Sequence, residues 1–261
     1  MEQPPAERND MNQTKQAILL LAGEGKRLKP FTLSQPKCFA RVGGTRILEN
    51  ALNALAQNGC EHARLVIGHK ADVIRAVMKT GFSGVEITYI ENPDYKHTNS
   101  MYSLALGMRD LQGSCWVIEG DVFFEPKVLA LQPVGEIAWY VDSSTRQLDG
   151  AYVQTGADGT AERLAIVRDL AHLGPSLSKS AGILHLSTRG LLLFRSWLAD
   201  AITRGRKNDY YDLILGDNLQ SKAVRTVDVA GCKWFEVDNQ QDLELAEKIF
   251  APSFNERADH T

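Results

Sequence analysis

The stretch Ile18–Leu28 constrains the fold of this chain more than any other part of the sequence. It opens with a short apolar run, typical of a buried parallel strand, and the run ends abruptly at Gly23 and Gly25. Glycines allow backbone N–H groups to turn toward an anion without a Cβ in the way. The cations that follow this turn are Lys26, Arg27 and Lys37. The sequence therefore predicts a phosphate-binding loop at the end of a strand.

Two common phosphate loops do not fit this stretch. A dinucleotide-binding turn requires a third glycine where Leu28 stands, and a P-loop requires a Gly-Lys-Ser/Thr end that is absent. The longer string Leu-Ala-Gly-x-Gly-x-Arg-Leu, with Pro36-Lys37 after a gap, resembles the signature loop of nucleotidyltransferases, which join a nucleoside triphosphate to a phosphorylated acceptor and release pyrophosphate. That family usually has a small residue where Leu21 stands. By this resemblance, the residues expected to bind the triphosphate are Leu21, Ala22, Gly23, Glu24, Gly25, Lys26 and Arg27.

Length and charge limit the classes of protein that remain. The 261 residues suffice for one large α/β domain, and a net charge of −3 argues against a general binder of nucleic acid or anionic membranes. We expect a disordered tail over 1–15, the nucleotidyltransferase domain over 16–250 and a loose tail over 251–261. No apolar run is long enough to span a bilayer. The cysteines (Cys38, Cys60, Cys115 and Cys232) form no C-x-x-C pair, so reduced thiols and a cytoplasmic location are expected.

Alternating strand and helix patterns predict the fold class. In the first half, the expected strands are 18–22, 64–68, 85–90 and 114–118, and the expected helices are 46–58, 71–79 and 100–111. In the second half, the expected strands are 137–142, 151–155, 163–167, 180–186, 224–229 and 234–238, with helices over 189–204 and 239–250. This order predicts a single-domain, mostly parallel, Rossmann-like sheet flanked by helices. A small mixed β extension in the second half is expected to form the acceptor side.

Two aspartates follow predicted strands and are candidate Mg²⁺ ligands. Asp121 comes after Val-Ile-Glu-Gly, and Asp238 ends Trp-Phe-Glu-Val-Asp. Taken alone, an aspartate at either place is equally a turn or helix-cap residue. Together, at the carboxyl ends of two strands, they suit Mg²⁺ held by carboxylates and phosphate oxygens.

A polar cluster follows the third expected strand. Asn92 precedes a proline, which favours an extended conformation, and Thr98, Asn99 and Ser100 follow shortly after it. Their amide and hydroxyl groups can read a pyrimidine edge and ribose hydroxyls. They are also good helix N-caps, so capping alone is the alternative.

This polar cluster points to one subgroup of the nucleotidyltransferases. Asn-Pro-x-Tyr followed by Thr-Asn-Ser-x-Tyr-Ser-Leu is similar to cytidylyltransferases that act on phosphocholine and on 2-aminoethylphosphonate. The resemblance implies CTP as donor, Mg²⁺ as cofactor, and a CMP-linked product with release of pyrophosphate. It implies that Arg27, Lys37 and Asp121 are catalytic, that Asp121 and Asp238 hold the metal, and that Asn92 and 98–100 bind the cytidine.

The acceptor side is less clear from sequence. A cationic head group favours carboxylates or aromatic faces, and a primary amine favours the former while a quaternary amine favours the latter. Candidate acceptor-binding residues are Tyr140, Asp142, Lys179, Tyr210, Tyr211, Asp212 and Glu236; Trp139, Trp234 and Arg168 were considered with them. Each aromatic residue, taken singly, is also typical of a core. The histidines have no metal-ligand spacing.

Three alternative functions remain open at this point. The first is a sugar- or inositol-1-phosphate nucleotidylyltransferase. The second is a non-catalytic nucleotide-binding regulatory module, which the retained Arg27, Lys37, Asp121 and Asp238 disfavour. The third is a Rossmann-type redox domain, which Leu28 disfavours. The choice of acceptor and the oligomeric state, a homodimer included, are also open.

Overall fold

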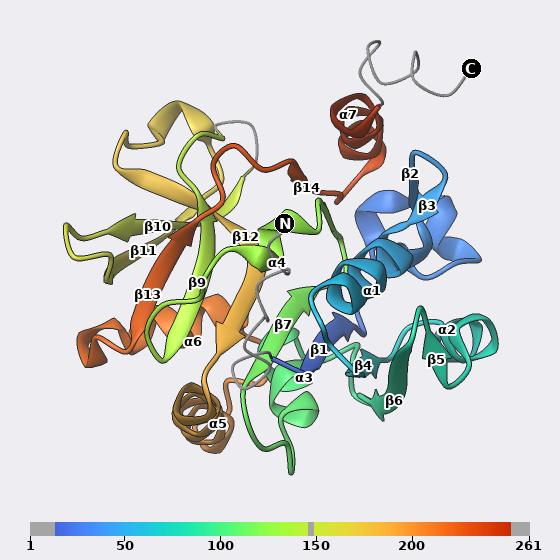
Figure 1. Cartoon of the computed structure of the whole chain (residues 1–261), viewed down its shortest axis with the longest axis horizontal. Helices are drawn as coiled ribbons and strands as arrows, with labels where there is room; N and C mark the ends of the chain where they lie inside the picture. Colours follow the sequence, from blue (N-terminus) through green and yellow to red (C-terminus); the bar gives the residue numbers. More distant parts are fainter. Residues whose placement is uncertain (1–13, 146–148, 252–261) are drawn as a thin grey trace, which may run out of the picture.

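The computed structural model describes residues 14–145 and 149–251, so nearly all of the two expected tails lies outside the described residues. Within this part, a mixed sheet runs through the molecule with helices on both faces (Figure 1). The strand order is β11-β10-β12-β7-β1-β4-β6-β5, and β9 pairs with both β12 and β13. Strands β7, β1, β4 and β6 are parallel, whereas β10, β11 and β12 are joined antiparallel. The predicted α/β class, with a mixed extension in the second half, is confirmed.

The elements have the following bounds. The strands of the main sheet are β1 (Gln16–Leu21), β4 (His62–Ile67), β5 (Gly81–Phe82), β6 (Val85–Glu91), β7 (Cys115–Glu119), β9 (Ile137–Asp142), β10 (Gly150–Thr155), β11 (Ala161–Val167), β12 (Leu177–Leu186) and β13 (Val224–Asp228). Two small ladders join β2 (Arg41–Val42) to β3 (Thr45–Arg46) and β8 (Val122–Phe124) to β14 (Trp234–Glu236). The α-helices are α1 (Ile47–Gln57), α2 (Ala71–Met78), α3 (Ser100–Gly107), α4 (Lys127–Ala130), α5 (Thr188–Thr203), α6 (Tyr211–Asp217) and α7 (Gln240–Phe250). Short 3-10 helices are η2 (Lys26–Leu28), η3 (Phe31–Leu33), η4 (Lys37–Phe39), η5 (Leu170–His172) and η6 (Leu219–Ser221).

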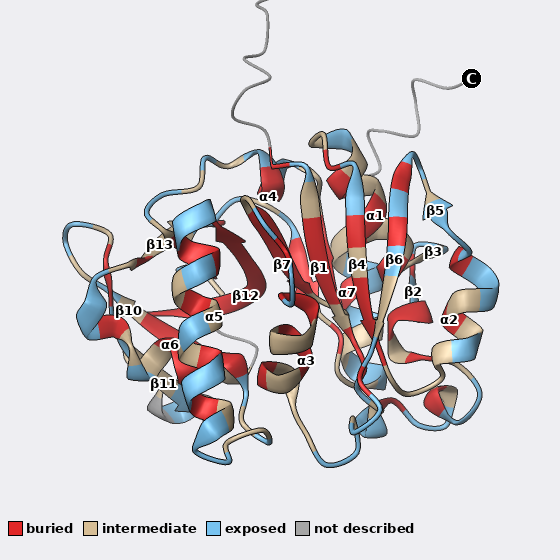
Figure 2. Cartoon of the chain, turned by 90° about the horizontal axis from the view of Figure 1, so that it is seen from below, coloured by how far each residue is buried: buried red, intermediate tan, exposed pale blue. Residues whose placement is uncertain are grey.

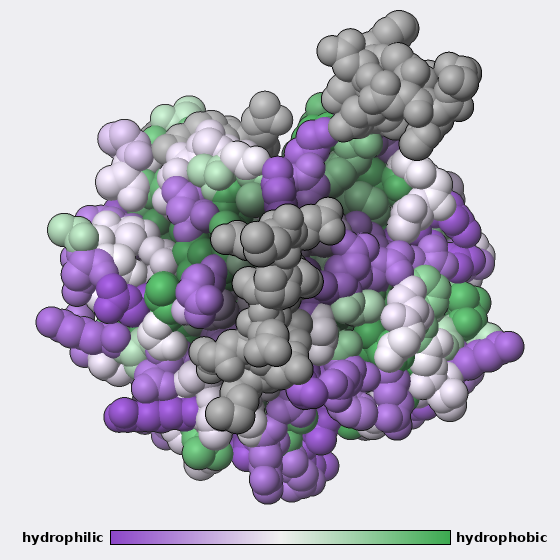
Figure 3. Space-filling model, in the orientation of Figure 1, coloured by the Kyte–Doolittle hydropathy of each residue, from purple (hydrophilic) through white to green (hydrophobic). Residues whose placement is uncertain are grey.

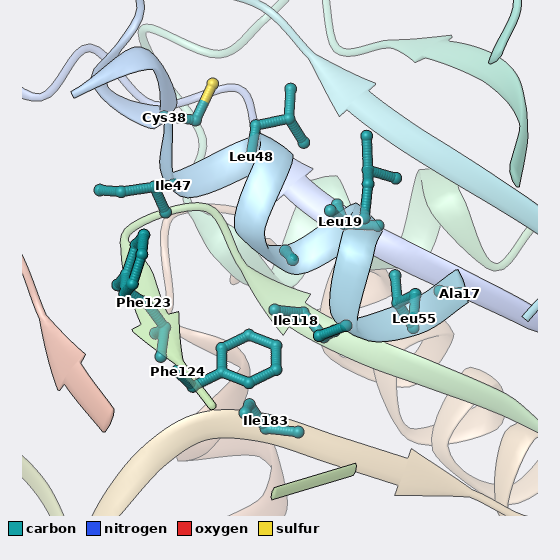
Figure 4. Close-up of a cluster of buried hydrophobic side chains, with 14 of the residues drawn as sticks. Ala17, Leu19, Cys38, Ile47, Leu48, Leu55, Ile118, Phe123, Phe124 and Ile183 are labelled. Atoms are coloured by element: carbon teal, nitrogen blue, oxygen red, sulfur yellow. The ribbon is translucent and has the colours of Figure 1, made fainter. Parts of the chain in front are cut away.

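Both faces of the central strands are buried, because helices cover each side (Figure 2). Along β1, Ala17 and Leu19 face the core under α1, α2 and α7, while Ile18 faces the core under α3, α5 and α6. Figure 4 shows part of the first of these cores, where Leu48 and Leu55 of α1 lie on the same side of the sheet as Leu19 of β1, and Ile118 of β7 lies near Phe124. Continuous apolar runs are what a parallel strand covered on both faces requires.

Helix α3 is shorter than the sequence predicts, ending at Gly107 instead of near residue 111. A Cβ on Gly107 would lie 2.7 Å from Ile18 Cγ2 and 2.9 Å from Val66 Cγ2, so glycine lets the helix end rest directly on β1 and β4. Asp110 then takes a left-handed conformation at φ 57°, which turns the chain toward β7. Close packing at the helix end therefore overrides the apolar periodicity that continues past it.

The surface is mixed. On the face drawn in Figure 3, hydrophilic side chains form most of the outline and apolar atoms show in smaller areas between them. The large exposed apolar side chains among the described residues are scattered singly, at Leu33, Val77, Val134, Ile166, Leu192, Tyr210 and Leu245. Single exposed apolar residues are common on protein surfaces and by themselves mark no binding site.

His185 of β12 is a buried histidine that makes stability depend on pH. Its Nε2 shares a hydrogen bond with Thr14 Oγ1 at 2.7 Å, and Trp116 contacts the ring edge-on at 4.9 Å between centroids. Burial lowers its pKa from the ordinary 6.5 to about 4. Because the unfolded chain takes up this proton first, the native state is favoured above pH 6.5 and loses that stability as the pH falls toward 4.

We expect the free energy of unfolding to fall by roughly 3 kcal/mol between pH 6.5 and 4 through His185, at about 1.4 kcal/mol per unit of pKa shift. Denaturant titrations of the wild type and of His185→Gln at several pH values measure this. The variant should show a flatter dependence over that range. His97→Gln, which alters an exposed ring, is the matched control. Equal slopes in the wild type and His185→Gln would contradict the assignment.

Candidate active site

The glycine loop is shaped by its contact with Lys37. Gly25 has φ 59°, and a Cβ there would lie 2.9 Å from Lys37 Cβ and 3.1 Å from Thr32 Cγ2. The Gly25 carbonyl oxygen accepts hydrogen bonds from Thr32 Oγ1 and the Leu28 amide, both at 3.0 Å. Gly23 has open space where its Cβ would be. Gly25 therefore brings Lys37 against the loop, and Gly23 leaves the backbone open toward the cavity.

The small ladder β8–β14 brings the two predicted metal ligands together. Asp121 immediately precedes β8, and Val122 is paired with Glu236 of β14. The amide of Val237 donates to the Asp121 carbonyl oxygen at 2.9 Å. Carboxylate oxygens of Asp121, Glu236 and Asp238 consequently lie within 4.8 Å of one another.

Lys37 bridges the two aspartates. Its Nζ donates to Asp121 Oδ2 at 2.7 Å and to Asp238 Oδ1 at 2.6 Å, and Arg27 lies 2.6 Å from Asp238 Oδ2. Burial by itself would lower the pKa of Lys37, but the two carboxylates raise it well above its ordinary value. Burial likewise opposes ionisation of Asp238, yet Lys37 and Arg27 hold its pKa below the ordinary value. Lys37 is therefore a fixed cation and cannot serve as a base at neutral pH.

The three carboxylates fit a hard divalent cation. Asp121 Oδ1 is buried and has no hydrogen-bond partner among the residues of 14–145 and 149–251. Carboxylate oxygens are the ligands that Mg²⁺ prefers, usually one or two together with phosphate oxygens and water. Glu236, which the sequence analysis placed at the acceptor side, is a third possible ligand. In the sequence, the indication that Glu236 could be a metal ligand is its position two residues before Asp238.

The cavity beside these carboxylates has two connected parts. The part next to the glycine loop measures about 430 Å³ and is lined by Leu21, Gly23, Glu24, Gly25, Lys26, Arg27, Lys37 and Lys96, among others. The inner part measures about 250 Å³ and is lined by Ala22, Ser100, Glu119, Lys179, Ser180, Asp212 and Glu236, among others. Both parts are lined by Tyr95, Thr98, Asn99, Asp121, Tyr210 and Asp238. One cavity therefore joins the predicted phosphate loop to the predicted acceptor side.

Asn92, which was expected to bind the cytidine, does not line the cavity. It is 1% exposed, and its amide nitrogen donates to Thr98 Oγ1 and Ser103 Oγ, each at 3.0 Å. Its Oδ1 accepts from the Asp94 amide at 3.1 Å. Because these bonds use the side chain and it lines neither part of the cavity, Asn92 shapes the turn that presents Thr98.

The turn 98–100 connects the nucleotide side to the acceptor side. Asn99 caps α3 by accepting from the Ser100 amide at 2.9 Å, as the alternative interpretation expected. Its own amide donates to the Lys207 carbonyl oxygen at 3.0 Å, and Ser100 Oγ accepts from the Tyr211 amide at 3.2 Å. The turn is thus fixed to the segment that leads into α6.

Three of the predicted acceptor residues do not reach the cavity. Tyr140 is fully buried and donates to the Leu131 carbonyl oxygen at 2.8 Å, and Asp142 accepts from Trp234 Nε1 at 2.7 Å. Tyr211 is fully buried as well. The reason for the first two is that β9 is buried along its whole length, because its two faces pack into the two hydrophobic cores of the molecule. These residues belong to the core.

The other predicted acceptor residues do line the cavity: Lys179, Tyr210, Asp212 and Glu236, together with Arg168. Lys179 is buried, and its Nζ donates to Glu236 Oε2 at 2.8 Å and to the Ser180 carbonyl oxygen at 3.1 Å. Burial raises the pKa of Glu236 to about 7 and that of Asp212 to about 6. Sequence reasoning missed the cavity residues Tyr95, Glu119, Asp149 and Ser180. Of these, Tyr95 is the tyrosine of the Asn-Pro-x-Tyr motif, and Glu119 is a carboxylate at the end of β7, so the sequence carried a signal for both.

Residues 17–132 match the MobA-like NTP transferase domain family. This segment of the chain is thus similar to an NTP transferase domain. The matched segment includes the glycine loop, Lys37 and Asp121, whereas Asp238 and Glu236 lie beyond it.

Two curated relatives and one solved structure extend the comparison beyond residues 17–132. CMP-5'-(3-aminopropyl)phosphonate synthase of Streptomyces rubellomurinus is 32% identical over 246 residues, which is 90% of this chain and 39% of the relative. Choline-phosphate cytidylyltransferase of Haemophilus influenzae is 27% identical over 230 residues, covering 87% of this chain and 93% of the relative. CTP:phosphocholine cytidylyltransferase from Streptococcus pneumoniae has a similar fold, with a TM-score of 0.74 at 20% identity over 91% of this chain and 99% of that one. The chain thus spans well under half the length of the Streptomyces relative. Among the described helices, none is both long and apolar enough to cross a membrane.

Proposed function

We propose that the chain is a cytidylyltransferase that moves CMP from CTP to a small amino-bearing phosphonate or phosphate and releases pyrophosphate. The observation that carries this proposal is the Lys37 ammonium fixed beside the glycine loop between Asp121 and Asp238, two carboxylates that line both parts of the cavity. The names of the Streptomyces and Haemophilus relatives, a CMP-aminoalkylphosphonate synthase and a choline-phosphate cytidylyltransferase, support the choice of CTP and of an amino-bearing acceptor.

The proposed reaction is an in-line displacement at the α-phosphorus of CTP. An acceptor oxygen forms the new O–P bond, the bond between the α-phosphorus and its bridging oxygen to the β-phosphate breaks, and pyrophosphate leaves with the electron pair. The acceptor oxygen is already anionic at neutral pH, so no general base is required. The protein's task is to hold two anions together and to stabilise the charge that moves onto pyrophosphate.

Different residues of this chain hold the anions and stabilise the charge. Backbone amides of 22–25 face the triphosphate, Lys37 contacts the α-phosphate, and Arg27 lies at the open side of the loop. Asp121, Asp238 and Glu236 are positioned to hold Mg²⁺, which would neutralise the phosphate oxygens when bound. Thr98, Asn99 and Ser100 present the polar groups that select the base and ribose.

Pyrophosphate release tests this proposal. CTP and UTP are each combined with 2-aminoethylphosphonate, phosphocholine, glucose-1-phosphate and inositol-1-phosphate, and kcat/KM is measured for every pair. We expect CTP to exceed UTP by at least about 100-fold, because a site that receives the cytosine amino group leaves a buried group unpaired with uracil. An amino-bearing acceptor should be the best. Equal use of UTP and CTP, or faster turnover of either cyclic acceptor, would contradict the proposal.

A further inference from the structure

The inner part of the cavity carries two carboxylates that form no ion pair with a described cation. Two other carboxylates of the cavity each lie close to Lys37: Asp121, and Asp238, which also pairs with Arg27. The next two ion pairs are Glu236 with Lys179 at 2.8 Å and Asp149 with Arg168 at 3.2 Å. Glu119 and Asp212 line the inner part and have no ion pair with any residue that the structure describes.

Of Glu119 and Asp212, Asp212 has the more unusual environment for a carboxylate. It is 7% exposed, it lines the cavity, and its Oδ1 is buried without a hydrogen-bond partner within the described ranges. A buried carboxylate without a partner carries a large desolvation cost, which is why such groups are normally paired or bonded. Lys179, the lysine of this part, donates instead to Glu236 and to the Ser180 carbonyl oxygen. The geometry therefore indicates a missing cationic donor beside Asp212.

The aromatic residues that would suit a quaternary ammonium are packed elsewhere. Trp139 Nε1 donates to Ser180 Oγ at 2.9 Å, while Tyr140 and Trp234 hold core hydrogen bonds. Only Tyr95 and Tyr210 are aromatic among the described residues lining the inner part, and both also line the outer part. A trimethylammonium group has no N–H donors and binds through aromatic faces, whereas a primary ammonium brings three donors.

We propose that Glu119 and Asp212 form the binding site for a primary ammonium group of the acceptor, so that the chain selects primary aminoalkyl phosphonates or phosphates over phosphocholine. This inference rests on the proposed function and names the acceptor class of the same site. The ammonium donates to Asp212 and Glu119, its charge balances theirs, and the opposite end of the acceptor lies toward Asp121 and Lys37. Both residues lie at the ends of elements. Glu119 is the last residue of β7, and Asp212 is the second residue of α6.

The test compares acceptors that differ at one end. With CTP and Mg²⁺, kcat/KM is measured for 2-aminoethylphosphonate, for ethylphosphonate, which lacks the amine, and for phosphocholine. We expect the first to exceed each of the others by about 100-fold, as loss of a charge-assisted bond to a buried group does. Asp212→Asn and Glu119→Gln should each reduce that preference at least about tenfold, mainly through KM for the amine. Asp212→Asn should also improve 2-hydroxyethylphosphonate relative to the amine, a change that a purely structural defect would not produce.

Asp149→Asn is the matched control, since Asp149 lines the same cavity but is already paired with Arg168. It should keep the wild-type preference. If the wild type uses ethylphosphonate or phosphocholine as well as the primary amine, or if both acidic-site variants keep the preference, this inference is overturned while nucleotidyl transfer stands. Absence of pyrophosphate release with every acceptor overturns the proposed function and the inference together.

Discussion

Replacing Asp121 or Asp238 with asparagine is expected to reduce CMP transfer to the background rate, a loss of at least about a thousandfold in kcat. Both carboxylates contact Lys37, and with Glu236 their oxygens lie within 4.8 Å of one another. The amide keeps the size of the side chain but removes the negative charge that a divalent cation requires. Pyrophosphate release at saturating CTP and a range of Mg²⁺ concentrations measures the effect.

Direct metal binding separates this role from a structural one. Mg²⁺ titration calorimetry of the CTP complex should show weaker binding for both variants, while circular dichroism should show an intact fold. Asp217→Asn is the control, because Asp217 is an exposed carboxylate paired with Arg206 outside the cavity. A variant of Asp121 or Asp238 that keeps near wild-type turnover with Mg²⁺ would remove that residue from the metal site.

Lys37→Ala is expected to lower kcat/KM for CTP by about 100- to 1000-fold, as loss of one preorganised charge-stabilising donor typically does. The pKa of Lys37 lies well above its ordinary value, since both carboxylates outweigh its burial, so it is charged throughout the pH range of the assay. The loss should therefore be independent of pH between 6 and 9. Steady-state kinetics at several pH values measure it.

Two variants on the glycine loop provide comparisons for the loss expected with Lys37→Ala. Arg27→Ala removes a more exposed cation that contacts only Asp238 in the described structure, so a smaller loss is expected. Lys26→Ala alters a side chain that is 70% exposed and paired with Glu24, and it should have the smallest effect. Unchanged kcat/KM for CTP in both Lys37→Ala and Arg27→Ala would refute the assignment of the phosphate loop.

The sequence determined much of the fold and part of the site. The apolar runs of the parallel strands, the amphipathic helices and the glycine turns are local patterns, and the strands and helices lie close to where these patterns predict them. The sequence also predicted the glycine loop, Lys37, Asp121 and Asp238, and the structure brings them to one cavity. The glycine loop follows β1 and Asp121 follows β7, and parallel strands present such ends to one edge of the sheet.

Only the tertiary structure decided which side chains face the cavity. Tyr140 and Asp142 have the residue types of a binding site, but β9 is an inner strand of the sheet whose two faces are covered by the two hydrophobic cores. Asn92 was expected to contact the nucleotide, yet its amide is used by Thr98 and Ser103. No local pattern distinguishes a polar side chain that binds a ligand from one that fixes a turn.

The grouping of the acidic residues in the cavity could not be predicted from the sequence either. Glu236 joins Asp121 because β14 pairs with β8, and Glu119 and Asp212 line one cavity although they are far apart in sequence. Sequence spacing reports only neighbours along the chain, whereas the charge balance of a cavity depends on every group that folding brings within a few ångströms. The sequence by itself thus specified the strands and the phosphate loop, and the packing of the second half against the first decided where the charges meet.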